Sequence, residues 1–92
     1  MLKPLEANTL SFSGITLLQS GEFDRAKDLL EESVKLNPSD PMLYINLISC
    51  YLVLGRKEEA KGLLDKVKEL GGKSIVENPR FKSFEDSIRR IQ

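Results

Sequence analysis

The side chains that most often carry out catalysis or bind metals are sparse in this chain. Histidine is absent, which removes histidine-based metal sites and the Ser-His-Asp and Cys-His forms of nucleophilic catalysis. The single cysteine, Cys50, lies in an apolar stretch beside Tyr51, where a buried, inert thiol is favoured over a reactive one. Because no nucleophile–base pair can be assembled, the sequence predicts a protein without catalytic residues.

Carboxylate pairs are present, but their spacing indicates solvated helix surfaces. Asp28 and Glu32 fall on the charged side of a predicted helix, and Glu58 and Glu59 do the same on another. The Gly-Gly-Lys-Ser segment at 71–74 resembles only the end of a phosphate-binding loop. It lacks the first glycine at the required distance and follows a helical pattern. The sequence therefore predicts neither a metal nor a cofactor.

The size and charge of the chain favour one small domain. It has 92 residues with 14 basic and 14 acidic side chains, so its formal net charge is zero. That balance gives no overall attraction to nucleic acid or to an anionic membrane. The apolar runs are far too short to span a bilayer, and no apolar stretch after Met1–Lys3 suggests a signal peptide. We expect a cytoplasmic protein that binds neither nucleic acid nor membranes.

The chain aligns with itself at an offset of 34 residues. Gly21 matches Gly55, Ala26 matches Ala60, and the leucine pair at 29–30 matches the pair at 63–64. A self-match at a fixed period of this length is typical of helix–turn–helix repeats. Such repeats stack because each buries its apolar face against its neighbours.

Apolar periodicity and helix-breaking residues predict the helices that form these repeats. Gly21 and Gly55 suit the left-handed conformation that follows a helix. We expect Gly71 and Gly72 to end the fourth helix and residues 73–78 to form a loop. The five predicted helices cover residues 5–19, 23–36, 41–54, 57–70 and 79–91.

The last of these helices is amphipathic, and Asn78 is the expected N-cap residue. Its apolar stripe is formed by Phe81, Phe84, Ile88 and Ile91. Its basic side chains are Arg80, Lys82, Arg89 and Arg90. Because a repeat array exposes an apolar face at its end, this helix is expected to cover the second repeat.

These features resemble the tetratricopeptide repeat family. Repeat one, residues 7–40, matches the family pattern at Leu10, Gly14, Leu17, Gly21, Phe23, Ala26, Leu30 and Pro38. Repeat two, residues 41–74, matches it at Tyr44, Leu47, Tyr51, Gly55, Ala60 and Leu64. The departures from the pattern are Ser13, Ile48, Lys57 and Gly72. The resemblance implies one all-α domain, a right-handed superhelical stack of antiparallel helix pairs with five helices, closed by the capping helix 79–91.

In the family, the first helix of each pair lines a concave groove that binds another protein. The resemblance places the inward positions of repeat one at Asn8, Ser11, Phe12, Ile15, Leu18 and Gln19. It places those of repeat two at Met42, Ile45, Asn46, Ser49, Leu52 and Val53. Asn46 is the strongest candidate for a contact with a partner's backbone, because an amide both donates and accepts. These positions include no basic residue, so an acidic chaperone C-terminus is not the expected ligand.

Three interpretations of this apolar surface stay open at the level of sequence. It binds a helical or extended segment of a partner protein, which is the favoured hypothesis and includes a small assembly chaperone for a secreted subunit. It is covered by the chain itself, through Leu2 and Leu5 or through the final helix. It is buried in a homodimer, which would make the protein a structural subunit.

Overall fold

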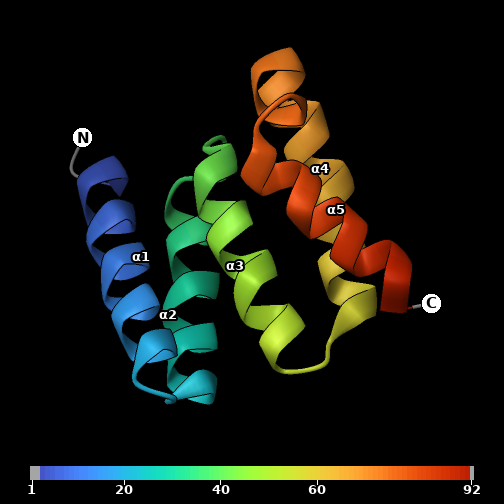
Figure 1. The fold of residues 1–92 in the computed structure, drawn as a ribbon. Helices are drawn as coiled ribbons and strands as arrows, with labels where there is room; N and C mark the ends of the chain where they lie inside the picture. The colour runs from blue at the N-terminus through green and yellow to red at the C-terminus, as the bar shows by residue number, and fades with distance from the viewer. Residues whose placement is uncertain (1–2, 92) are drawn as a thin grey trace.

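The computed structural model describes the backbone of residues 3–91, which form a stack of helices (Figure 1). Side chains are described for residues 5–71, 77–79, 81–83, 85–87 and 90. The helices are α1 (Lys3–Gln19), α2 (Phe23–Leu36), α3 (Pro41–Val53), α4 (Lys57–Val76) and α5 (Pro79–Ile91). No strand occurs within residues 3–91, so the predicted all-α fold is confirmed.

Local sequence signals account for most helix ends. Gly21 and Gly55 adopt φ angles of 85° and 76°, in the left-handed region, and they form the turns within the two helix pairs. Asp40 is the N-cap of α3, where its Oδ1 accepts a hydrogen bond from the backbone N–H of Met42 at 3.0 Å. Pro41 follows as the first residue of that helix, where a missing N–H costs nothing.

The predicted end of α4 at Gly71 and Gly72 is wrong. The helix continues through both glycines to Val76, so only residues 77 and 78 connect it to α5. Glycine inside a helix costs about 1 kcal/mol relative to alanine, which weakens a helix without ending it. A helix ends at glycine when the backbone turns to positive φ, and that turn occurs here at Gly21 and Gly55.

The first helix pair packs closely because Gly14 has no side chain. A Cβ atom placed on Gly14 would lie 2.7 Å from Cγ of Leu30 and 3.3 Å from the backbone oxygen of Ala26. Both Ala26 and Leu30 are fully buried. This contact confirms the expectation that small residues at 14 and 26 bring α1 and α2 together.

The stack curves because its first helices lie closer together than its second helices. α1 contacts α3 and α3 contacts α5, whereas α2 and α4 make no contact with each other in the described part of the chain. In Figure 1, α3 lies in front of α2 and α5 lies in front of α4. The helices α1, α3 and α5 therefore form the inner layer of the curve.

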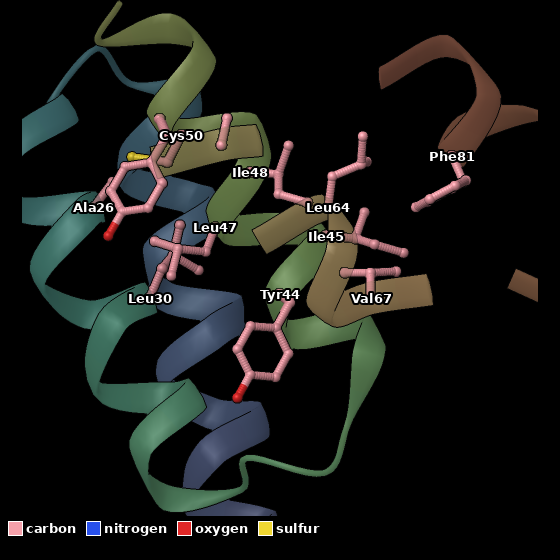
Figure 2. Packing of buried hydrophobic residues seen from close by; sticks show 12 residues of the cluster. Ala26, Leu30, Tyr44, Ile45, Leu47, Ile48, Cys50, Leu64, Val67 and Phe81 are labelled. Atoms are coloured by element: carbon pink, nitrogen blue, oxygen red, sulfur yellow. The ribbon is translucent and has the colours of Figure 1, made fainter. Parts of the chain in front are cut away.

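The core lies between the two layers and extends to the last helix. Figure 2 shows Phe81 of α5 pointing toward Ile45, Leu64 and Val67, and all of these side chains are buried. This packing confirms that α5 covers the second repeat. The predicted partners Phe84, Ile88 and Ile91 lie outside the described side chains, as do Leu2, Arg80 and Arg89. None of the helices, as far as the chain is described, is long and apolar enough to cross a membrane.

Candidate protein-binding groove

Two equivalent rows of side chains line the inner layer. Both rows follow the spacing i, i+4, i+7, i+11, which keeps residues on one face of a helix. The row on α1 consists of Asn8, Phe12, Ile15 and Gln19. The row on α3 consists of Met42, Asn46, Ser49 and Val53. Each member of the second row stands 34 residues after its counterpart in the first. α1 contacts α3, and Asn46 of the second row bonds to Ser11 beside the first row; we call the two rows together the inner stripe.

The inner stripe exposes large apolar side chains. Phe12 is 75% exposed, Val53 52% and Met42 41%, although burial of such groups is normally favourable. Ile15 is half-buried and packs against the core cluster. The polar members Asn8 and Gln19 are exposed, while Asn46 and Ser49 are half-buried. The result is an apolar surface that carries amide and hydroxyl groups, suited to binding another protein.

Two residues predicted to line the groove are buried instead. Ser11 is 3% exposed and Ile45 is 2% exposed. They occupy the same position in their repeats, and that position faces the next inner helix. Ser11 meets Asn46 on α3, and Ile45 packs toward Phe81 on α5 (Figure 2). Ile45 is therefore a core residue covered by the final helix, one of the alternatives left open by the sequence.

Leu18 and Leu52, the other predicted groove residues, are half-buried and pack against the core cluster. The helical spacing contains the signal that separates them from the inner stripe. Positions 8, 12, 15 and 19 follow one face of α1, whereas 11 and 18 follow the face that contains the buried residues Ala7 and Gly14.

Asn46 is held by a hydrogen bond within the protein. Its Nδ2 donates to Oγ of Ser11 at 2.8 Å, which links α3 to α1. The bond uses one of the two N–H groups of the amide and fixes its orientation. Asn46 is thus positioned at the junction of the two rows of the inner stripe.

None of the eight residues of the inner stripe is ionisable. Arg25 pairs with Glu22 at 2.7 Å on the first hairpin, and Arg56 pairs with Glu59 at 3.5 Å on the second. The described residues contain no cluster of three potential metal ligands. The inner stripe itself therefore contains no acid–base side chain.

Two ionisable groups with shifted pKa values lie in the core behind the stripe. Burial, followed by the negative charge of Glu31, raises the pKa of the Cys50 thiol, whose Sγ lies 3.7 Å from the backbone oxygen of Phe23. Burial, followed by a hydrogen bond to Glu31, raises the pKa of Tyr51. That bond runs from the Tyr51 hydroxyl to Oε2 of Glu31 at 2.6 Å. The fully buried thiol confirms the predicted position of Cys50.

Stacked helical hairpins with glycine turns and a concave inner layer define the chain as a helical-repeat protein. Comparison with known proteins identifies which kind. A family model described as tetratricopeptide repeat matches residues 17–81, and the chain belongs to that family. This family is in general a non-catalytic scaffold for protein interaction.

A solved structure supports the same fold. The first tetratricopeptide repeat domain of Spaghetti (RPAP3), bound to the HSP90 peptide SRMEEVD, is similar to this chain with a TM-score of 0.77. The two are 20% identical, and the match covers 95% of this chain and 69% of that one. At this identity the likeness establishes the fold alone. A search of the curated proteins found no match.

Proposed function

We propose that this protein binds a segment of another protein along the inner stripe and contributes no chemistry to it. The main support is the 75% exposure of Phe12 on an inner helix of a tetratricopeptide repeat stack. Met42 and Val53 extend the apolar surface onto α3. An amphipathic helix or an extended segment that buried these side chains would gain about 25 cal/mol for each Å² of apolar area removed from water.

The proposed segment is apolar and uncharged where it meets the protein. The similar solved domain binds SRMEEVD, a peptide with three acidic side chains. The described inner stripe of this chain carries no lysine or arginine to pair with them. Burying a carboxylate without a partner is costly, whereas an apolar side chain against Phe12 is favoured. We therefore expect SRMEEVD to bind poorly here.

Site-specific photo-crosslinking tests the proposal and identifies the partner in the same experiment. A photoreactive residue at Val53 is expected to capture a protein in the native lysate, and mass spectrometry of the adduct then identifies the segment. The matched control carries the same photoreactive residue at Lys66, an exposed position on α4 outside the inner stripe. Equal capture from both positions would contradict a specific groove.

Charge substitution tests the same surface by affinity. Because Met42 and Val53 are exposed, M42D and V53D are expected to keep the helical circular dichroism signal while weakening binding of the captured segment at least tenfold. The control K66D introduces the same carboxylate on α4 and is expected to leave binding unchanged. Saturable binding of labelled SRMEEVD that weakens with added salt would contradict the proposed uncharged ligand.

A further inference from the structure

A second uncharged surface lies on α1, on the side away from the rest of the protein. The face of α1 that meets α2 and α3 contains Ala7, Ser11 and Gly14, which are buried. The opposite face is exposed, and we call it the outer face of α1. It consists of Leu5, Thr9, Phe12, Ser13 and Thr16.

The five residues of the outer face are uncharged although they face water, and the exposed Glu6, seven residues before Ser13, lies at the edge of this face. No residue between Glu6 and Glu22 is ionisable. By contrast, the exposed residues of α2 and α4 include many carboxylates and cations, as is usual for a helix in contact with water. Leu5 is 65% exposed and Phe12 75%, so two large apolar groups stand two helical turns apart on this face. A helix without a charged side is typical of one that is covered in its working state.

The two threonine hydroxyl groups of this face are already satisfied within the helix. Oγ1 of Thr9 donates to the backbone oxygen of Leu5 at 3.0 Å, and Oγ1 of Thr16 donates to that of Phe12 at 3.1 Å. A hydroxyl with an internal partner costs less to remove from water than one that loses its hydrogen bond. The outer face can therefore be covered by an apolar surface without leaving these donors unpaired.

The spacing of the large side chains on the outer face allows it to pair with a second copy of itself. A surface hollow of about 340 Å³ is lined by Leu5, Asn8, Thr9, Phe12 and Ser13. In two antiparallel α1 helices related by a two-fold axis between residues 8 and 9, Phe12 of each copy lies level with Leu5 of the other. A two-fold interface requires such self-complementarity, and the five residues of each face oppose their copies without like-charge repulsion, the two Glu6 carboxylates lying at the edge. The formal net charge of zero also removes long-range repulsion between copies.

From these observations we propose that the outer face of α1 binds the outer face of a second copy, antiparallel, with each Phe12 packed against the other Leu5. A further repeat is a poorer occupant of this face. At the equivalent positions of α3, the residues that stack on the first hairpin are apolar and buried: Leu43, Leu47 and Cys50. Their counterparts on α1 are Thr9, Ser13 and Thr16, which lack that apolar surface.

Sedimentation equilibrium at increasing concentration tests the pairing. One helix face is a small interface, so we expect a weak dimer with a Kd between about 1 μM and 1 mM. L5D places two carboxylates against apolar surface and is expected to raise that Kd at least tenfold. The control K66D is expected to leave it unchanged. Leu5 is used because it lies outside the inner stripe, whereas Phe12 belongs to both surfaces. A monomer across this range of concentration, or a dimer unaffected by L5D, would overturn the proposal.

Cysteine crosslinking tests the register. In T9C the two thiols lie beside the two-fold axis and are expected to form an intermolecular disulfide under mild oxidation. T16C places its two thiols on the same exposed face but far from the two-fold axis. With a rise of 1.5 Å per residue, these thiols lie about 22 Å apart along the helices, so we expect no crosslink. The native Cys50 is fully buried, so the unmodified protein provides the background. Crosslinking of T16C as readily as T9C would overturn the antiparallel register.

Discussion

The first helices of the two repeats, α1 and α3, hold equivalent places but have different surroundings. α3 lies in the middle of the stack, between the first hairpin and α5, and seven of its 13 residues are buried. α1 lies at the edge and has neighbours on one side only. Apolar residues on α3 that meet the preceding hairpin therefore have hydroxyl residues as their counterparts on α1. The inner stripe keeps exposed members on both helices, Phe12 on α1 and Val53 on α3.

This difference distinguishes the positions of a repeat that stabilise the stack from those proposed to bind a partner. At positions that stack on a preceding hairpin, the residue type depends on whether such a hairpin is present. At the inner stripe the dependence is weaker. Gln19 and its counterpart Val53 are both exposed, one on the edge helix and one on the interior helix, so exposure at this position does not depend on the edge. Phe12 is 75% exposed, whereas its counterpart Asn46 is half-buried and bonded to the preceding hairpin through Ser11 on α1.

The largest expected effect compares one position in the two helices. Leu47 is 2% exposed in the core, and L47A removes its packing at a cost of about 2–5 kcal/mol in the free energy of unfolding. Its counterpart Ser13 is exposed, so S13A is expected to change stability by less than about 0.5 kcal/mol. Urea unfolding measures both values. Similar losses for the two variants would break the comparison between edge and interior.

Two glycine substitutions are expected to act in opposite directions. In G14A the new Cβ would lie 2.7 Å from Cγ of Leu30, and such overpacking costs about 1–3 kcal/mol. The gain in helix propensity is about 1 kcal/mol, so we expect G14A to be less stable than the natural protein. In G62A, on α4, nothing lies within 4 Å, so the propensity gain raises stability. Thermal unfolding of each variant checks the signs. A stabilised G14A would show that α1 and α2 are not in close contact.

A smaller effect is expected for the bond between the inner helices. The Nδ2 of Asn46 lies 2.8 Å from Oγ of Ser11, and such a bond contributes about 0.5–1.5 kcal/mol. A double-mutant cycle with S11A, N46A and both together isolates the coupling free energy. Additive losses would mean that α1 and α3 are joined by packing alone.

The smallest effect concerns pH, through Tyr51, which connects α3 to the preceding helix α2. Its pKa in the folded protein is raised above the ordinary value of 10.0, so folding favours the neutral phenol. This contribution is complete below pH 10 and is lost as the pH rises above it, because the unfolded chain then ionises first. Urea unfolding between pH 8 and pH 11 is expected to show a steeper loss for the natural protein than for Y51F. Equal slopes would argue against burial of this phenol.

Much of the fold follows from the sequence because its signals are local. The glycine turns, Pro41 and the 34-residue repeat indicate the helix pairs, and the bounds of α2 are as predicted. The end of α4 was missed because a glycine pair lowers helix stability without dictating where the backbone turns. Helical spacing separates Ile45 from the inner stripe, as it does its counterpart Ser11, but the partner that buries it, Phe81, lies 36 residues away and is not indicated by any local pattern.

The central claim is that α1 and α3 share one inner binding surface, and an NMR titration tests it most directly. The segment identified by crosslinking is added to the isotopically labelled protein, and backbone amide shifts are followed. We expect the largest changes at Phe12, Ile15, Ser49 and Val53, on two helices at once, with little change on the outer residues of α2 and α4. Changes concentrated on α2 and α4, with the inner stripe unaffected, would contradict the account.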